Sequence, residues 1–334
     1  MSVYIIAEAG VNHNGNLELA KQLVDMAKAC GADAIKFQTF KAEESTSSLA
    51  EKAEYQKRND KKEESQFDMI KKLELPFELF SVLKHYCEER EIDFISTPDG
   101  VDSLNCLVDI GVPIIKIGST EVTNLAFLAE IAKTQRAIIL STGMSTLGEV
   151  EKAIEIIVEN GNSNITLMHC TTDYPTQISE VNLRAMLTLR DAFKLPVGYS
   201  DHTEGIETAI AATALGAVCI EKHITLDKNM EGPDHKASMQ YEEFKQYVQC
   251  VRNTECLLGD GKKRPTIHEK NIMNQVRRSI LTSRKLEKGT IITEDMLCYK
   301  RPGYGIAPEY TSIVLGRKLK RDMDKEEMIK WEDI

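Results

Sequence analysis

The sequence predicts a (β/α)8 barrel followed by a small β-rich domain, and three observations lead to this prediction. Short apolar runs alternate eight times with stretches of helical apolar spacing before Pro265. Such alternation is typical of parallel strands joined by helical crossovers, and eight units close a barrel. Beyond Pro265 the pattern changes to short β-like runs and turn glycines. The 334 residues accommodate one barrel of about 250 residues and one small appendage.

The eight apolar runs are the predicted barrel strands. They lie at Tyr4–Ala7, Ala34–Phe37, Asp93–Ser96, Ile114–Ile117, Ala137–Leu140, Ile165–Met168, Val197–Tyr199 and Val218–Ile220. The first predicted helix, 17–30, places Leu19, Leu23 and Met26 on one face and lysines on the other. Only the second unit carries a large insertion, at 41–75, which either covers the mouth of the barrel or forms a solvated surface hairpin.

Three segments follow from these patterns. Residues 1–265 form the predicted barrel, whose last helix begins near Tyr241 and ends at "LGDGKKRP". Residues 266–276 are a predicted linker, and residues 277–334 are the predicted β-rich domain.

Charge and composition exclude several classes of protein. The net charge of −10 argues against general binding of nucleic acid. Residues 262–334 carry 17 Lys/Arg and 11 Asp/Glu, whereas residues 1–261 carry 25 and 41, so a basic tail follows an acidic barrel. No apolar stretch approaches the roughly 18 residues that cross a bilayer, and no signal peptide is recognisable. The eight cysteines lack CxxC spacing. We therefore expect a cytoplasmic protein with reduced thiols and no membrane partner.

Polar side chains follow nearly every predicted strand. In barrel enzymes the reaction site lies at the carboxyl ends of the strands, so these side chains should converge on one mouth. In chain order they are Glu8, Lys36, Gln38, Ser96, Thr97, Lys116, Ser119, Glu121, Ser141, Thr142, His169, Thr171, Tyr174, Ser200, Asp201, His202, Glu221, Lys222 and His223.

Two of these groups indicate ligands. Lys36 and Lys116 interrupt apolar runs, and an unpaired ammonium group inside a barrel is costly, so the lysines predict an anion site with Ser119, Ser141 and Ser200. His202 and His223 each follow an apolar run. Neutral imidazole is a common ligand of divalent metals, and two histidines leave coordination positions open. Each histidine could instead be a hydrogen-bonded loop residue.

Three carboxylates are candidate acid–base groups. Glu8, Glu121 and Asp234 could each donate or accept a proton or anchor a hydroxyl group beside a metal or lysine. Each could equally cap a helix. No GxGxxG or Walker motif stands where a nucleotide site would need it.

The ordered motifs resemble the sialic acid (nonulosonic acid) synthase family almost end to end. They are "IIAEAGVNHNG", "GADAIKFQT", "ISTP", "IKIGSTE", "LSTGM", "HCTTDYPT", "VGYSDHT", "IEKHITLD", "GPDHKAS" and "KRPGYGI". The resemblance implies a TIM barrel joined to an antifreeze-like (SAF) domain. It also implies condensation of phosphoenolpyruvate with an N-acylated mannose-type sugar, which yields a nine-carbon α-keto acid and phosphate.

The resemblance assigns expected roles by motif. His202 and His223 would bind a divalent metal, with Mn²⁺ preferred and Mg²⁺ or Co²⁺ as alternatives. Phosphoenolpyruvate would contact Lys36, Thr97, Lys116, Ser119, Ser141, Tyr174 and Ser200, while Glu8, Gln38, Glu121 and Asp234 would surround the metal and the sugar. Arg301 would reach the N-acyl group in the site of the other subunit of a domain-swapped homodimer. As a residue beside a proline, Arg301 could equally be an ordinary surface group.

Two positions depart from the family pattern. Asp99 stands where phenylalanine is expected, which predicts a changed pocket rim. Thr120 stands where glycine is expected, which removes the easy access of glycine to positive φ just before Glu121.

Several functions remain open at this point. The favoured substrate is 2,4-diacetamido-2,4,6-trideoxymannose, giving N,N'-diacetyllegionaminate, and N-acetylmannosamine is the alternative. A metal-dependent aldolase or hydrolase would need a Schiff-base lysine or a third ligand, for which His169 and Asp201 are candidates. A non-catalytic carbohydrate- or ice-binding protein would leave the strand-end residues unexplained.

Overall fold

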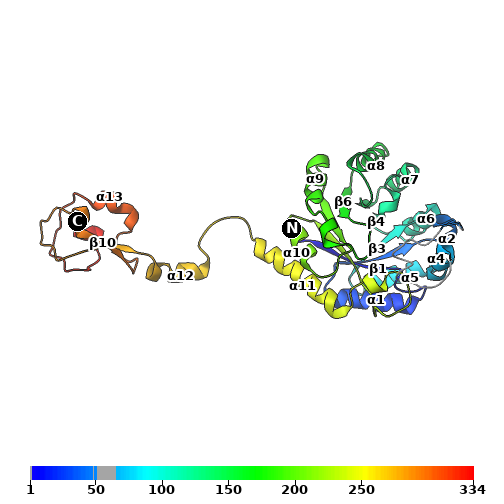
Figure 1. Cartoon of the computed structure of the whole chain (residues 1–334), viewed down its shortest axis with the longest axis horizontal. Helices are drawn as coiled ribbons and strands as arrows, with labels where there is room; N and C mark the ends of the chain where they lie inside the picture. The colour runs from blue at the N-terminus through cyan, green and yellow to red at the C-terminus, as the bar shows by residue number, and fades with distance from the viewer. Residues whose placement is uncertain (1, 48, 51–64) are drawn as a thin grey trace. The chain divides into compact units, whose positions relative to one another are not determined.

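Eight parallel strands close into a barrel, as the sequence predicts (Figure 1). The computed structural model describes residues 2–47, 49–50 and 65–334, and part of the predicted insertion lies outside these residues. The barrel strands are β1 Tyr4–Gly10, β2 Ala34–Thr39, β3 Asp93–Pro98, β4 Ile114–Ile117, β5 Ala137–Ser141, β6 Ile165–Cys170, β7 Val197–Asp201 and β8 Cys219–His223. Pairing of β1 with β8, which sets Glu8 beside His223, completes the ring.

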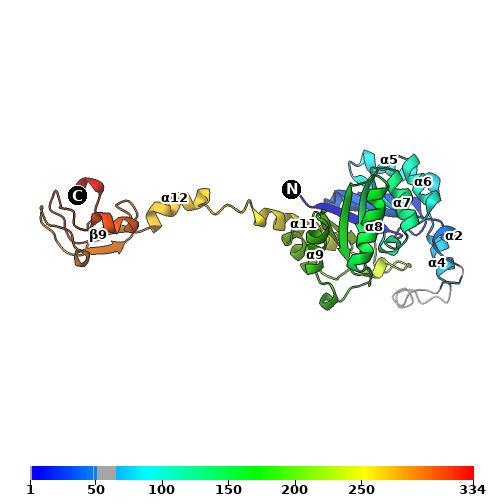
Figure 2. The same ribbon diagram turned by 90° about the horizontal axis from the view of Figure 1, so that it is seen from above.

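Helices surround the strands on the outside. α7 and α8 lie side by side on the barrel in both views (Figures 1 and 2). Among the described residues before Gly259, the helices are α1 Leu17–Cys30, α2 Ala42–Ser45, α4 Gln66–Leu73, α5 Phe77–Glu89, α6 Val101–Asp109, α7 Leu125–Lys133, α8 Leu147–Glu159, α9 Arg184–Phe193, α10 Glu207–Ala214 and α11 Tyr241–Leu258.

Alternation along the strands separates two buried layers. Outward-facing strand residues pack against the helices and form the main core. Inward-facing residues fill the lower barrel with an apolar cluster and the upper barrel with polar groups. The apolar cluster consists of Ile6, Ala34, Ile95, Ile139, Met168 and Cys219. Because the side-chain period is two, the polar residues two positions further along each strand face the mouth.

The chain divides into two units, Met1–Gly259 and Asp260–Ile334. The first unit therefore ends six residues before the predicted end of the barrel at 265. The segment that we predict as a linker, 266–276, is a helix over most of its length, α12 Ile267–Val276. Thr266 begins this helix with a capping box: its hydroxyl accepts from the Glu269 amide, and the Glu269 carboxylate accepts from the Thr266 amide.

The second unit has its own small core and little regular structure. Strands β9 Ser279–Thr282 and β10 Leu297–Lys300 pair in antiparallel fashion, and the short helix α13 spans Thr311–Val314. Its core consists of Ile280, Leu286, Ile292, Leu297, Ile306, Val314, Leu319, Met323, Ile329 and Ile334.

Within the described part of the chain, no helix combines the length and the apolar character needed to cross a membrane. All eight cysteines are free thiols.

Candidate active site

Two lysines and two glutamates meet inside the upper barrel. Lys36 Nζ lies 2.6 Å from Glu8 Oε2 and 3.8 Å from Glu221 Oε2, and Lys116 Nζ lies 3.7 Å from Glu221 Oε1. All four residues are at most 5% exposed. The predicted inward direction of the lysines is confirmed, and carboxylates compensate their charge within the described structure.

Hydroxyl groups from three further strands join these charges. Lys116 Nζ donates to Ser141 Oγ at 2.6 Å, Lys36 Nζ lies 3.4 Å from Thr97 Oγ1, and Ser200 Oγ donates to Glu221 Oε1 at 3.2 Å. A cavity of about 240 Å³ opens onto this group. Cationic and hydroxyl donors around one cavity are the groups that an oxyanion such as phosphate or carboxylate needs.

Burial shifts the pKa values of these groups in different directions. Burial lowers the pKa of Lys116. Burial would do the same to Lys36, but the carboxylates of Glu221 and Glu8 outweigh it and raise the pKa of this lysine. Burial and the nearby Glu221 raise the pKa of Glu8 to about 7, despite the attraction of Lys36. Lys36 thus stays protonated at neutral pH, and Glu8 is able to exchange a proton there.

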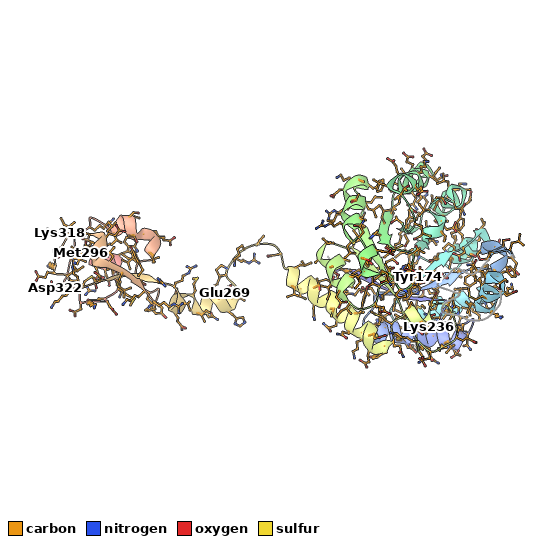
Figure 3. All side chains as sticks on the ribbon, viewed as in Figure 1. Tyr174, Lys236, Glu269, Met296, Lys318 and Asp322 are labelled. Carbon is orange, nitrogen blue, oxygen red and sulfur yellow. The ribbon has the colours of Figure 1, made fainter. Side chains whose placement is uncertain are left out.

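The two predicted metal ligands lie side by side at the ends of β7 and β8. The ring centroids of His202 and His223 are 5.7 Å apart, and the Tyr174 ring lies 4.1 Å from the first and 5.7 Å from the second. Tyr174 is labelled on the barrel in Figure 3. Burial lowers the pKa of His202 to about 4 and that of His223 well below its ordinary value. Both imidazoles are therefore neutral at neutral pH.

The histidine nitrogens fit a metal by their hydrogen bonding. His202 Nδ1 lies 2.7 Å from the Thr171 carbonyl oxygen, which only accepts, so Nδ1 carries the proton and Nε2 presents its lone pair. His223 Nδ1 is buried without a hydrogen-bond partner in the described structure. In the same residues, no set of three or more His, Cys, Asp or Glu side chains adopts a metal-holding arrangement. A metal here would use the two histidines and leave positions for other ligands.

The two candidate third ligands are engaged elsewhere. His169 Nε2 lies 2.7 Å from the Val181 carbonyl oxygen. Asp201 points out of the barrel and accepts hydrogen bonds from Thr203 and Tyr247, the latter at 3.0 Å. These contacts weaken the hydrolase alternative, which needs one of them at the metal.

A second cavity, of about 450 Å³, continues from the first. Glu121 and Asp234 line it, and Asn124 Nδ2 donates to Glu121 Oε2 at 2.7 Å. Burial raises the pKa of Asp234 to about 6. The residues that line both cavities are Gln38, Asp99, Thr120, Tyr174 and His223. Predicted acid–base groups and predicted anion ligands therefore face one continuous space.

The two departures from the family pattern both lie at this junction. Burial and the neighbouring carboxylate of Glu121 raise the pKa of Asp99 to about 7. Thr120 lies within the 3-10 turn Ser119–Glu121, a right-handed backbone that threonine adopts without strain. Glu121 reaches the cavity without the glycine that the family pattern has before it.

Glu221 is among the strand-end residues predicted to converge on the mouth, but no functional role was predicted for it. It contacts both lysines and Ser200 at the centre of the site. A usable signal was present, because Glu221 lies two residues before His223 in one strand and must face the same way. Ser119 reaches the small cavity from the turn after β4, where its hydroxyl accepts from the Gly143 amide at 2.9 Å.

Arg301 belongs to the second unit. It is exposed directly after β10. Its predicted contact with the substrate of a partner subunit stays a prediction.

Known families match both units of the chain. A family model described as the NeuB family matches residues 23–263, and a model of the SAF domain matches residues 277–334. The second match identifies the β-rich unit as an SAF domain.

Characterised relatives match nearly the full length. The N,N'-diacetyllegionaminic acid synthase of Campylobacter jejuni is 47% identical over 328 residues, 98% of each chain. The N,N'-diacetyllegionaminic acid synthase of Legionella pneumophila is 46% identical and covers 100% of this chain and 95% of its own length. A solved structure, the N-acetylneuraminic acid synthetase of Leptospira borgpetersenii, matches 82% of this chain and 90% of its own with a TM-score of 0.72 and 34% identity.

Proposed function

This chain belongs to the NeuB family, and we propose that it condenses phosphoenolpyruvate with 2,4-diacetamido-2,4,6-trideoxymannose to give N,N'-diacetyllegionaminate and phosphate. The observation that carries the proposal is the continuity of the lysine-lined cavity with the carboxylate-lined cavity through His223 and Tyr174. One end suits an anion, the other suits a polyhydroxyl chain, and the reacting carbons would meet between them. The identity to two legionaminic acid synthases supports the choice of sugar.

Phosphoenolpyruvate is proposed to bind in the small cavity. Lys36 and Lys116 neutralise its phosphate and carboxylate, while Ser141 and Ser200 donate hydrogen bonds. Thr97, Ser119 and Tyr174 complete the proposed contacts. Bound in this way, the methylene carbon is held toward His223 and the larger cavity.

The sugar is proposed to react as an open-chain aldehyde. The methylene carbon attacks the aldehyde carbon and forms the new C–C bond, which leaves a positive centre on the former enol carbon. Water adds there, and the C–O bond to phosphate then breaks, so that phosphate departs with the bridging oxygen. The buried carboxylates Glu8 and Glu221 face the region where positive charge develops and would stabilise it.

Acidic residues move protons in this scheme. Glu121 and Asp234 line the sugar cavity, and the raised pKa of Asp234 allows it to exchange a proton near neutral pH. Gln38 Nε2 lies 3.4 Å from Glu8 Oε1 and orients that carboxylate.

A divalent metal, with Mn²⁺ preferred, is proposed to be held by His202 and His223. When bound, it would polarise the aldehyde oxygen and stabilise the negative charge that forms there. His202 is pre-oriented for this role by its bond to the Thr171 carbonyl oxygen.

A domain-swapped homodimer is proposed for the assembly. In it, Arg301 of one subunit binds the N-acyl group in the site of the other. The net charges of +6 for residues 262–334 and −16 for residues 1–261 support such docking.

N-acetylneuraminate synthesis from N-acetylmannosamine is the second candidate, favoured by the structural match to the Leptospira enzyme. One experiment separates the two: phosphate release from phosphoenolpyruvate is measured with a panel of N-acylated aldoses, with and without chelator. We expect release with the diacetamido sugar, loss with chelator and recovery with Mn²⁺. Absence of phosphate release under every condition would overturn the proposed function.

A further inference from the structure

One side of the larger cavity is apolar, although the rest of its lining is largely polar. Val11, Phe40, Met69 and Leu73 form a separate hydrophobic cluster, and all four also line the cavity. We call these four residues the apolar wall. None of their side chains can donate or accept a conventional hydrogen bond.

The apolar wall is assembled from three parts of the chain. Val11 follows β1, Phe40 follows β2, and Met69 and Leu73 lie one turn apart on α4. The exposed fractions of the four residues are only 4–8%, so they are nearly buried even though they border the cavity.

A capping bond orders the first turn of α4, and contacts of the residue that follows α4 connect the helix to the loops of the barrel. The Ser65 hydroxyl caps its first turn by accepting from the Asp68 amide at 3.1 Å, and Glu74 Oε1 accepts from the Ala42 amide at 2.5 Å. The chain after α4 also packs closely on the loop after β1. A Cβ added at Gly15 in that loop would lie only 3.0 Å from the Glu74 carbonyl oxygen. The residue that follows α4 thus connects this helix to the chain segments after β1 and β2, which carry Val11 and Phe40.

The position of the apolar wall decides which part of the sugar it meets. His223 lies where the two cavities join, so the aldehyde carbon C1 belongs at that end in the proposed reaction. The carbon farthest from C1 along an open hexose chain is C6. None of the four residues of the apolar wall lines the small cavity that holds the anion site, so a chain that extends from His223 into the larger cavity carries C6 away from the anion site and into the space that the wall borders.

From this arrangement we infer that the apolar wall receives the C6 methyl group of a 6-deoxy amino sugar and disfavours a C6 hydroxymethyl group. This inference rests on the proposed function and deepens it by naming the residues that recognise the substituent at C6. A methyl group against Met69 and Phe40 gains contact area. A hydroxyl group there loses its hydrogen bonds to water without replacement.

The test uses two aldoses that differ only at C6: N-acetylmannosamine and its 6-deoxy analogue. Both lack a 4-acetamido group, so a preference within the pair reports on C6 alone. Phosphate release from phosphoenolpyruvate gives kcat/KM for each sugar. We expect the 6-deoxy sugar to be preferred by about 10- to 100-fold, the range over which an apolar pocket discriminates such changes.

Three variants connect that preference to the apolar wall. Met69→Gln offers a hydrogen-bonding partner for a hydroxyl group and is expected to reduce the preference at least several-fold. Met69→Leu keeps an apolar surface and is expected to retain it. Met26→Gln places the same change at a buried methionine of α1 in the main core, which tests whether general destabilisation alters the ratio.

The outcomes separate this inference from the proposed function. If phosphoenolpyruvate releases no phosphate with either sugar of the pair or with the diacetamido sugar, the proposed function itself is contradicted. Equal efficiency with the two sugars overturns only the inference about the apolar wall. A clear preference that Met69→Gln leaves unchanged, or that Met26→Gln alters equally, also overturns it.

Discussion

Lys36 and Glu8 form a buried ion pair in the barrel, with Nζ 2.6 Å from Oε2 and exposed fractions of 4% and 1%. The Glu8 carboxylate compensates the charge of the Lys36 ammonium group inside the barrel. An incoming phosphate must therefore share Lys36 with carboxylates that already contact it. Anion affinity at this site depends on how strongly Glu8 holds the lysine.

Replacing Glu8 with glutamine should expose that competition. We expect Glu8→Gln to raise the free energy of unfolding modestly at neutral pH, because the neutral amide replaces a carboxylate whose pKa burial raises to about 7, and Glu221 stays beside Lys36 as a counter-charge. Phosphoenolpyruvate should then raise the melting temperature of the variant more than that of the unmodified chain. Thermal unfolding with and without the ligand measures both effects.

Glu18→Gln provides the matched control for this change. Glu18 pairs with Lys21 on the surface of α1 at 3.0 Å, with 73% of its side chain exposed. Its loss should cost less than about 1 kcal/mol and leave the ligand-induced shift unchanged. A Glu8→Gln variant with an equal or smaller ligand-induced shift would show that Glu8 does not compete with the anion.

The metal assignment predicts a specific loss at His223. We expect His223→Ala to weaken Mn²⁺ binding, which electron paramagnetic resonance measures. We also expect kcat to fall by at least about 100-fold, because a metal that stabilises developing charge contributes several kcal/mol. The fold should persist, because the ring lies at the mouth rather than in the main core. His85→Ala, on the exposed surface of α5, is the control. Unchanged Mn²⁺ binding by His223→Ala would refute the assignment.

Asp99 should make stability fall as pH rises. Its pKa is raised from 3.8 to about 7, so between these values the folded chain holds a proton that the unfolded chain has released. Stability therefore decreases with rising pH across this window and levels off above it. An asparagine side chain mimics the protonated form of Asp99 and does not titrate. The substitution Asp99→Asn should therefore raise the unfolding free energy by roughly 1–3 kcal/mol at pH 8 and by less at pH 5.

Urea unfolding at the two pH values tests this sign. Asp109→Asn, at the exposed end of α6, serves as the control and should change stability little at either pH. A stabilisation by Asp99→Asn that is larger at pH 5 than at pH 8 would contradict the assigned direction.

Arg301 is expected to act on sugar binding. An N-acyl contact made both before and during the reaction is uniform binding, so Arg301→Ala should mainly raise the KM for the sugar and leave kcat nearly unchanged. Mixing Arg301→Ala subunits with His223→Ala subunits tests whether Arg301 acts in the site of the other subunit. One site of a mixed dimer would then contain both an intact Arg301 and an intact His223. Recovery of activity supports action in trans, whereas a mixture no more active than its components contradicts it.

The sequence predicted the barrel and most of its mouth because both depend on local alternation. Apolar runs marked the strands, and the period of two placed Lys36, Lys116 and Ser200 on the inner face. The same rule would have included Glu221, which the list of strand ends names but the predicted site omits. The period of two also directs the Asp201 side chain outward, although Asp201 directly follows Ser200, whose side chain faces inward.

Other features depended on contacts that no local pattern records. Met69 joins Val11 and Phe40 only because α4 docks on the loops after β1 and β2. The charge of the insertion suggested either a cover over the barrel mouth or a surface hairpin, and it did not predict that Met69 and Leu73 line the cavity. The helix within the predicted linker was missed for a local reason instead: the Thr266 and Glu269 pair is a helix-start signal that the surrounding polar composition concealed.

Contacts on the outward faces of β7 and β8 constrain the length of these two strands. Lys222 Nζ lies 3.3 Å from Asp201 Oδ2, and Tyr247 of α11 donates to the same oxygen at 3.0 Å. Residues one position away on the same strands, Ser200 and His223, face the mouth. Deleting or inserting one residue within either strand would turn its anchoring side chain inward and its reactive side chain outward. Neither strand can therefore gain or lose a residue without displacing both its buried anchor and its reactive side chain.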